Sequence, residues 1–190
     1  MIEVVLVRHG ETEWSRDGRH TGRTDIPLTE TGRRQAEKLG ELLRDRSFSL
    51  VLTSPLQRAA ETCRLAGLGD LARPTDDLLE WDYGEYEGIT TPQIRESRPG
   101  WLLWRDGCPA GEDAAAVGKR ADRVLEQTEH AGADVALFAH GHVLRVLTAR
   151  WLGLPPDSGA LFALSTATLS VLGYEREVRV IRLWNAPCEP

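Results

Sequence analysis

Four basic side chains follow apolar segments of the chain, in positions where they could handle a phosphoryl group. Arg8 and His9 directly follow the first apolar run, Arg58 lies shortly after the second, and His140 directly follows the third. One carboxylate, Glu80, lies between the second and third runs in a stretch rich in aromatic residues and glycine. Together these residues provide cations, imidazoles and a carboxylic acid.

Phosphoryl transfer can be carried out with these groups alone. Arginine forks bind non-bridging phosphate oxygens and remain charged throughout. An imidazole can attack phosphorus and carry the phosphoryl group as a covalent intermediate. A carboxylic acid can protonate the departing alkoxide, and its carboxylate can later activate water. Because arginines can neutralise the developing charge, the pattern predicts a reaction that needs no metal.

Three apolar segments are predicted to be the strands that position these side chains. Residues 2–7 form an almost continuous apolar run, and residues 50–52 and 135–139 form shorter ones. Such runs are typical of strands covered on both faces in a parallel sheet. Ligands of open α/β sheets bind beyond the carboxyl ends of the strands. We therefore expect the histidines and arginines to meet at one edge, beside helix N-termini that favour anions.

Amphipathic stretches between these strands predict helices. Thr29 can cap the first helix, and Ser54 is predicted to open the second with Pro55 in its first turn. A third helix precedes residues 135–139, and a fourth covers roughly 143–152. The apolar faces comprise Ala36, Leu39 and Leu43 in the first helix and Ala114, Val117, Ala121, Val124 and Thr128 in the third.

The remaining segments complete an α/β architecture. Residues 168–172 and 178–183 predict a hairpin that turns near 174–177. Residues 82–111, rich in Gly, Pro and Trp, predict an inserted lid or side wall with two short helices over the active site. We expect one domain spanning 1–190, an α/β/α three-layer sandwich with a mainly parallel central sheet.

Composition excludes several classes of protein. The net charge of −6 argues against nucleic acid as a partner. No stretch approaches the roughly 20 apolar residues of a membrane span, and residues 1–7 lack the features of a signal peptide. Cys63, Cys108 and Cys188 show no metal-site or disulfide spacing and predict reduced thiols, so we expect a cytoplasmic protein. The C-terminal hairpin and tryptophans expected at the surface are compatible with a homodimer.

Four sequence blocks resemble those of the histidine phosphatase superfamily, which includes the phosphoglycerate mutases. Residues 6–14, LVRHGETEW, resemble the family signature, and residues 54–62 resemble its second block. Residues 78–88 resemble the block that carries the acid, and residues 138–141 resemble the last catalytic block. The blocks occur in the family's order and extend over nearly the whole chain.

The resemblance implies a role for each of the five chemical residues. It implies that His9 is the nucleophile and that Glu80 is the proton donor. It further implies that Arg8, Arg58 and His140 bind the transferring phosphoryl group. It implies no metal and no other cofactor. On the residues alone, Glu11, Asp82 and Glu85 are alternative acids.

Five further residues are expected to contact the substrate. Thr21 and Gly22 match a loop that contacts phosphate and substrate in the family, although a simple polar turn is the alternative reading. Tyr83 matches a substrate-contacting tyrosine of the mutases, and Gly141 follows the last catalytic histidine. Ser15 and Thr21 replace an Asn and a Gln of many members. This region is more similar to the acid phosphatase and sugar bisphosphatase branch, which implies a small phosphorylated metabolite as substrate.

Three alternative functions stay open at this point. A mutase is disfavoured, because Trp81 replaces the arginine that mutases place after the acid and no Arg-Arg pair lies between Glu80 and His140. A non-catalytic phosphate-binding module would be expected to lack the nucleophile or the acid. A metal hydrolase would use His9, His140, His142 and Glu80 as ligands. We therefore expect an acid-phosphatase-like phosphoric monoester hydrolase.

Overall fold

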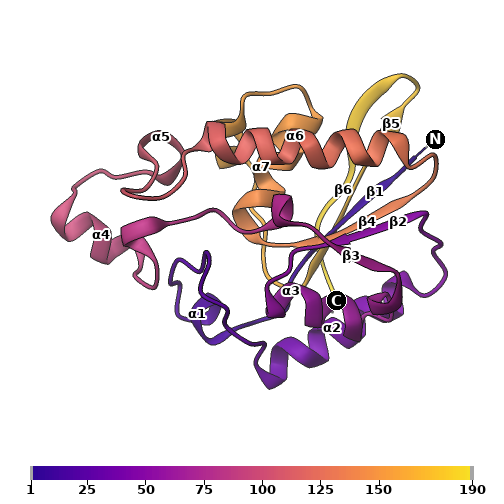
Figure 1. Cartoon of the computed structure of the whole chain (residues 1–190), viewed down its shortest axis with the longest axis horizontal. Coiled ribbons are helices and arrows are strands. Elements are labelled where there is room, and N and C mark those ends of the chain that lie inside the picture. The colour runs from indigo at the N-terminus through magenta and orange to yellow at the C-terminus, as the bar shows by residue number, and fades with distance from the viewer. Residues whose placement is uncertain (1, 189–190) are drawn as a thin grey trace.

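The computed structural model describes residues 2–188, in which six strands form a single sheet in the order β3-β2-β4-β1-β5-β6 (Figure 1). The strands are β1 (Val4–Arg8), β2 (Leu50–Thr53), β3 (Ala72–Pro74), β4 (Val135–Ala139), β5 (Thr168–Glu175) and β6 (Val178–Pro187). Strands β3, β2, β4 and β1 are parallel neighbours, whereas β5 pairs antiparallel with β1 and with β6. The prediction of a mainly parallel sheet is confirmed.

Helices cover both faces of this sheet. They are α1 (Glu13–Arg16), α2 (Glu30–Leu43), α3 (Gln57–Leu65), α4 (Thr91–Ser97), α5 (Leu103–Asp106), α6 (Ala114–His130) and α7 (Gly141–Trp151). Helices α2 and α3 pack on one face and α6 and α7 on the other, which confirms the three-layer sandwich (Figure 1). Thr29 caps α2 by accepting the Gly32 N–H at 3.0 Å, as predicted.

The central strands are buried on both faces, which explains their continuous apolar sequences. Successive side chains of a strand point to opposite faces. Leu6 accordingly packs in the cluster that includes residues of α6 and α7, whereas Val7 packs in the cluster that includes residues of α2 and α3. Leu137 and Phe138 divide in the same way on β4. Packing on both faces fixes β1 and β4, and thereby the positions of the residues that follow these strands.

Several boundaries differ from the sequence prediction. Helix α3 begins at Gln57 rather than at Ser54 or Pro55, because Leu56 has an extended backbone and serves as its N-cap. Helix α7 begins at Gly141, two residues earlier than predicted. Strand β5 continues to Glu175 and β6 begins at Val178, so the turn between them is shorter than predicted. Helix α1 and strand β3 were not predicted, because elements of three or four residues show no periodicity.

Three of the six tryptophans are buried, which corrects the expectation that the tryptophans lie at the surface, and the homodimer stays a prediction. Trp81, Trp101 and Trp151 are almost fully buried, and the other three are partly covered. The Trp104 ring packs edge-on against Trp81 with centroids 5.6 Å apart. In residues 2–188, no helix is both long enough and apolar enough to cross a membrane.

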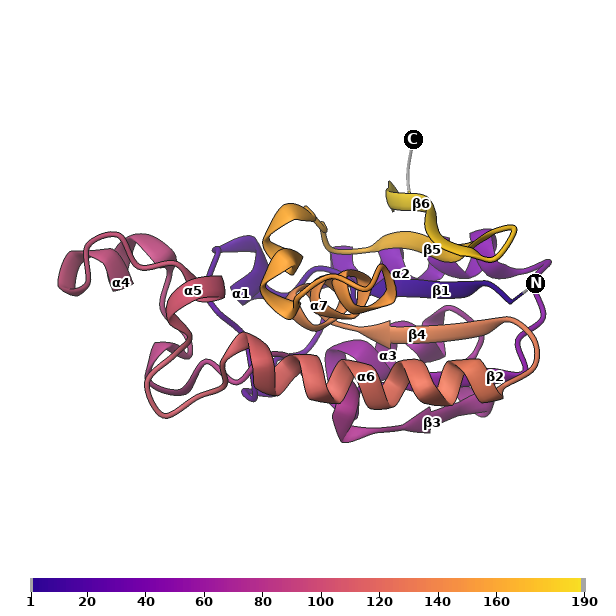
Figure 2. The same ribbon diagram turned by 90° about the horizontal axis from the view of Figure 1, so that it is seen from above.

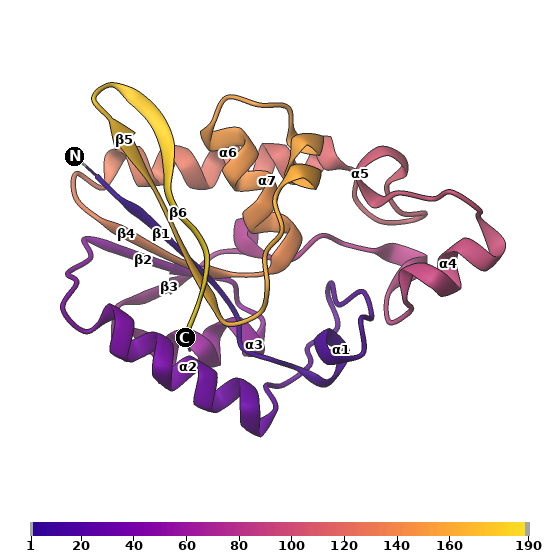
Figure 3. The ribbon, with the colours of Figure 1, turned by 180° about the vertical axis from the view of Figure 1, so that it is seen from behind.

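Residues 82–111 project beyond the carboxyl ends of the parallel strands, together with α1 (Figures 2 and 3). They contain α4 and α5, the two short helices expected there. The two ends of the segment are joined closely, because the Glu112 N–H donates to the Asp82 carbonyl at 2.9 Å. A Cβ on Gly111 would lie 2.4 Å from that same carbonyl oxygen, so only glycine permits this approach.

Candidate active site

His9 follows β1 and presents one ring nitrogen to a cavity. Its side chain is buried, and Nδ1 lies 2.7 Å from the Gly10 carbonyl oxygen. Because a carbonyl can only accept, Nδ1 carries the hydrogen and Nε2 keeps its lone pair. Burial lowers the pKa of His9 well below its ordinary value, and the charges of Arg58 and Arg8 lower it further. The ring is therefore a neutral imidazole with a nucleophilic Nε2.

Arg8 lies beside His9 and has a donor without a partner. The Leu164 carbonyl accepts a hydrogen bond from Nη1, but the buried Nε has no partner within residues 2–188. A Cβ at Gly141 would lie 3.2 Å from the Arg8 Cζ, so this glycine leaves room for the guanidinium. A buried donor without an acceptor is costly. The geometry suits an incoming anion.

His140 follows β4 and is fully buried next to His9. The centroids of the two rings are 5.2 Å apart, because β1 and β4 are paired in register up to Arg8 and Ala139. Arg58 Nε donates to His140 Nδ1 at 3.1 Å. The other nitrogen, Nε2, therefore carries the hydrogen and donates to Ser54 Oγ at 2.7 Å. Burial, followed by the charge of Arg58, lowers the pKa of His140.

Most N–H groups of the Arg58 guanidinium donate hydrogen bonds to other groups of the protein. Besides His140, its guanidinium donates to the carbonyls of Thr24 at 2.9 Å, Thr21 at 3.1 Å and Gly22 at 2.8 Å. One Nη1 hydrogen is left over. Arg58 thus ties the loop after α1 to the reaction centre, a positioning role that the sequence did not suggest. Its predicted contact with phosphate stays a prediction.

Glu80 lies at the N-terminus of α7, where its carboxylate is fixed by backbone donors. Oε1 accepts from the N–H groups of Trp81 and Val143, each at 2.9 Å, and Oε2 accepts from the His142 N–H at 3.0 Å. Oε1 is thus saturated by two donors, whereas Oε2 accepts only one. Since a carboxylate oxygen has about two acceptor positions, Oε2 keeps one acceptor position free.

The alternative acids are engaged elsewhere. Glu11 accepts the Thr29 hydroxyl at 2.8 Å, and Asp82 accepts the Gly84 N–H at 3.0 Å. Glu85 is exposed. Glu80 lines the cavity that contains His9, and these three acids do not. The geometry favours Glu80 as the proton donor.

Tyr83 and His142 form a hydrogen-bonded pair that lines the cavity together with Glu80. The Tyr83 hydroxyl and His142 Nδ1 are 2.5 Å apart. Burial raises the pKa of Tyr83 well above its ordinary value and lowers that of His142, so the hydroxyl donates to a neutral imidazole.

Within residues 2–188, no group of three His, Cys, Asp or Glu side chains could hold a metal ion.

The predicted substrate-binding residues fall into two groups. Ser15, Thr21, Tyr83 and Gly141 line the cavity, although the Ser15 hydroxyl is also part of the capping box of α1. Gly22 does not line it. Its N–H is held by both carboxylate oxygens of Glu87, at 2.8 and 3.1 Å, and its contact with substrate stays a prediction.

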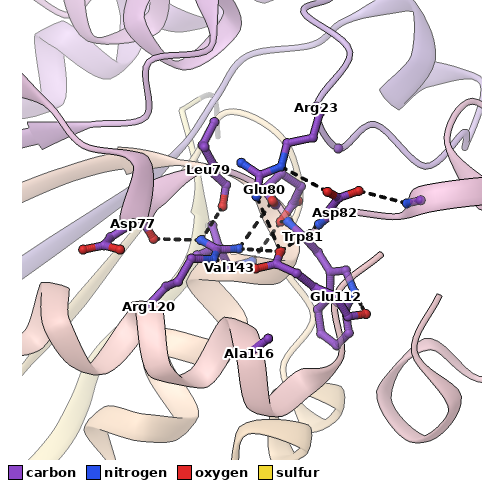
Figure 4. A network of polar contacts seen from close by, with 12 residues as sticks. Arg23, Asp77, Leu79, Glu80, Trp81, Asp82, Glu112, Ala116, Arg120 and Val143 are labelled. Atoms are coloured by element: carbon purple, nitrogen blue, oxygen red, sulfur yellow. Dashed lines mark hydrogen bonds and ion pairs between the residues drawn. The ribbon is translucent and has the colours of Figure 1, made fainter. Parts of the chain in front are cut away.

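Arg120 on α6 is a functional residue that the sequence analysis missed. Its buried guanidinium forms an ion pair with Glu112 at 2.8 Å. It also donates to the carbonyls of Asp77 and Leu79, each at 2.9 Å, and at 3.4 Å to that of Glu80 (Figure 4). These bonds fix the backbone that leads into Glu80. A mid-helix arginine resembles a solvated residue in the sequence, so only the tertiary contacts reveal this role.

Replacing Arg120 is expected to destabilise the protein and misplace the acid. Arg120→Met removes the closest ion-pair partner of the half-buried Glu112 carboxylate and one donor to each of three carbonyls, which costs about 3–5 kcal/mol of unfolding free energy. Urea unfolding measures the loss, and kcat should fall with it. Arg123→Met on the same helix is the control, because its pair with Asp77 is exposed and contributes at most about 1 kcal/mol. Equal losses in the two variants would contradict the role of Arg120.

The cavity itself is cationic. It has a volume of about 360 Å³, at the small end of the range for ligand sites. Four arginines line it, namely Arg8, Arg19, Arg95 and Arg145, against the single carboxylate of Glu80. This local charge opposes the net charge of −6 of the chain. A small anionic ligand fits both the size and the charge.

Three neutral histidines of the site, two buried and one partly exposed, predict acid sensitivity of the fold. Above about pH 6.5 both the folded and the unfolded states keep His9, His140 and His142 neutral. Below it the unfolded chain takes up protons that the folded protein excludes, so stability falls as pH falls. The slope is up to about 1.4 kcal/mol per pH unit for each histidine. Urea unfolding between about pH 7.5 and 5.5 measures it. His142→Gln should reduce the slope of unfolding free energy against pH. The control His130→Gln, at an exposed site, should not. Equal slopes in the two variants would contradict the claim that the folded protein keeps His142 neutral.

The chain belongs to the histidine phosphatase superfamily, since residues 4–187 match the sequence profile of its branch 1. It is 49% identical over 191 residues to an acid phosphatase of Mycobacterium tuberculosis, covering 98% of this chain and 94% of that protein. It is 39% identical over 182 residues to a sedoheptulose 1,7-bisphosphatase of Saccharomyces cerevisiae, covering 79% and 67%. The predicted family is confirmed, and so is the predicted similarity to acid phosphatases and sugar bisphosphatases.

Solved structures agree with this assignment. The structure of an open reading frame product from Mycobacterium tuberculosis superimposes with a TM-score of 0.93 at 46% identity, covering 98% of each chain. An α-ribazole phosphatase from Shigella flexneri superimposes with a TM-score of 0.83 at 30% identity, covering 97% of this chain and 96% of the other.

Proposed function

We propose that this chain hydrolyses phosphomonoesters of small metabolites through a phosphohistidine on His9. The observation that carries the proposal is the hydrogen bond from His9 Nδ1 to the Gly10 carbonyl, which leaves Nε2 free beside the unpartnered Nε of Arg8. Membership of the family and the phosphatases among the relatives support the same reaction.

The proposed reaction has two steps. His9 Nε2 attacks phosphorus while Glu80 gives its proton to the departing alkoxide. The Glu80 carboxylate then takes a proton from water as that water attacks the phosphohistidine, which releases phosphate and restores both groups. Arg8 and the remaining Nη1 hydrogen of Arg58 stabilise the charge on the phosphoryl oxygens. Both ring nitrogens of His140 are engaged, by Arg58 and by Ser54, so its predicted contact with the phosphoryl group stays a prediction.

The substrate and the location are part of the proposal. The small cationic cavity and a relative that is a sedoheptulose 1,7-bisphosphatase support a sugar phosphate or a similar small metabolite. The free thiols of Cys63 and Cys108 support a cytoplasmic location, where thiols stay reduced.

The test is phosphate release from a panel of sugar phosphates and other phosphomonoesters in excess EDTA. We expect full activity in the chelator, because Arg8 and Arg58 supply the charge that a metal would otherwise provide. Activity that is lost in EDTA and restored by a divalent metal would contradict the mechanism. Absence of phosphate release from the whole panel would contradict the proposed function.

A further inference from the structure

The peptide group that joins Gly10 to Glu11 makes one hydrogen bond on each side. Its carbonyl oxygen accepts the hydrogen of His9 Nδ1 at 2.7 Å, and its N–H donates to Gln35 Oε1 at 2.9 Å. This peptide is trans. The C=O and N–H of a planar trans peptide point in opposite directions. Holding the N–H on Gln35 therefore also fixes the direction in which the carbonyl faces His9.

The glycine at position 10 makes this orientation depend on Gln35. Glycine has the widest choice of backbone angles, so its own backbone does not hold the peptide group in place. A side chain is nevertheless excluded here, because a Cβ on Gly10 would lie 2.3 Å from the Gly32 carbonyl oxygen. Within residues 2–188, the Gly10 carbonyl and the Glu11 N–H have no hydrogen-bond partners besides His9 and Gln35.

Helix α2 brings Gln35 to this peptide group. The first turn of α2 packs directly on the backbone after His9, since a Cβ on Gly32 would lie 2.2 Å from the Glu11 carbonyl oxygen. The same carbonyl accepts the Thr29 N–H at 2.9 Å. Gln35 lies about one turn beyond Gly32, and side chains of a helix point back toward its N-terminus. The half-buried amide of Gln35 is thereby directed at the Glu11 N–H.

Helix α3 holds the preceding peptide group in a similar way. The Gly10 N–H donates to Thr62 Oγ1 at 3.1 Å, and this hydroxyl donates in turn to the Arg58 carbonyl at 2.7 Å. The two peptide groups on either side of Gly10 are thus each held by one side chain. The Gln35 bond is the one that bears on the imidazole, because it belongs to the peptide group whose carbonyl accepts from His9.

The tautomer of His9 depends on this arrangement. A neutral imidazole carries its hydrogen on one nitrogen, and the hydrogen bond made by that nitrogen decides which one keeps the lone pair. With the Gly10 carbonyl beside Nδ1, the lone pair is on Nε2. In the other tautomer Nε2 would carry the hydrogen and could not attack phosphorus. The bond from the Glu11 N–H to Gln35 also polarises the peptide group, which makes its carbonyl a stronger acceptor.

We propose that Gln35 is a positioning residue for the nucleophile: by accepting the Glu11 N–H, it holds the Gly10 carbonyl on His9 Nδ1 and keeps the lone pair on Nε2. The inference rests on the proposed function, in which Nε2 attacks phosphorus. Gln35 does not line the cavity, so it acts through the backbone and not on the substrate. Its replacement should therefore change the orientation of the imidazole and leave the binding of anions almost unaffected.

Nitrogen-15 NMR of protein with labelled histidines measures the tautomer directly and needs no substrate. The resonances of His9 are those that are missing from the spectrum of His9→Asn. In the wild type we expect the hydrogen on Nδ1 alone. Gln35→Met keeps the length of the side chain and removes the acceptor, so we expect a mixture of the two tautomers. Gln35→Glu keeps an acceptor oxygen at the same reach and should keep the wild-type tautomer. Gln127→Met, the same change at an exposed position of α6, is the control.

The kinetics of the same variants separate orientation from binding. In Gln35→Met, kcat should fall by about 10- to 100-fold, since displacing a reacting group by about 1 Å costs up to about 100-fold. Inhibition by inorganic phosphate should stay close to that of the wild type, because carbonyls other than those near Gln35 hold Arg8 and Arg58. Gln35→Glu should recover most of kcat, and Gln127→Met should equal the wild type. Thermal unfolding establishes that each variant is folded, and Gln35→Leu carries the test if Gln35→Met does not fold.

Three results would overturn the role of Gln35 and leave the phosphatase standing. The first is a Gln35→Met variant that keeps the wild-type kcat. The second is a fall in kcat while the tautomer of His9 stays that of the wild type. The third is a Gln35→Glu variant that loses as much activity as Gln35→Met. If the wild type releases no phosphate from any substrate of the panel, the proposed function itself fails, and the tautomer of His9 in Gln35→Met still decides whether Gln35 fixes the imidazole.

Discussion

His9→Ala is expected to reduce kcat by on the order of 10³-fold or more, since loss of the nucleophile from a coupled catalytic set removes the covalent route entirely. The imidazole is held between its bond to Gly10 and the neighbouring His140 ring, and no other described nucleophile replaces its Nε2 at this position. Steady-state phosphate release measures the loss.

The His9 variant should keep the anion site. Arg8 remains in place, because its position depends on the Leu164 carbonyl and on the space above Gly141 rather than on the imidazole. Vanadate or phosphate should therefore still bind to His9→Ala, although more weakly. Retention of more than a few per cent of activity would show that His9 is not the nucleophile. Loss of all anion binding together with the fold would make the variant uninformative about chemistry, and His9→Asn, of similar shape, then serves instead.

Glu80→Gln is expected to slow the hydrolysis of sugar phosphates by about 10²–10⁴-fold, the usual contribution of general acid catalysis. A sugar alkoxide is a strong base and needs the proton of the acid during bond cleavage, whereas a nitrophenolate leaves as a weak base. The first step with nitrophenyl phosphate should therefore fall far less. The pre-steady-state burst measures that step separately, because Glu80 also assists the later hydrolysis.

The hydrogen bonds around Glu80 determine the control. A glutamine can keep the two donors on one oxygen, from Trp81 and Val143, but its amide nitrogen then faces the His142 N–H. Thermal unfolding of the variant measures the cost of that mismatch. Glu85→Gln, the same change at an exposed acid nearby, should leave both bursts unchanged. If Glu80→Gln slows both bursts equally, Glu80 binds or positions the substrate and is not the acid.

The sequence predicted the residues at strand ends well, because their place depends on a short-range pattern. An apolar run predicts a buried strand, and the residue that follows it must lie at the carboxyl end of that strand. His9 and His140 are in contact for this reason, since β1 and β4 are neighbours in register. The helices with clear apolar faces, α2 and α6, were predicted for the same reason.

The contacts that fix these residues could not be predicted in the same way. Arg58 was expected to hold phosphate, yet most of its donors go to His140 and to carbonyls more than 30 residues away in sequence. Arg120 and Arg145 occupy helix positions that look solvated in the sequence. Their partners are carbonyls of distant loops, which leave no periodic signal.

The position of the phosphoryl group on the imidazole tests the mechanism most directly. Wild-type enzyme mixed with substrate and quenched within milliseconds should carry one acid-labile phosphoryl group on His9. Because Nδ1 donates a hydrogen bond to the Gly10 carbonyl, we expect the phosphoryl group on Nε2. Phosphorus NMR of the quenched protein distinguishes a phosphoryl group on Nε2 from one on Nδ1. A phosphoryl group on Nδ1, on another residue, or none during a measurable burst would contradict the proposed mechanism.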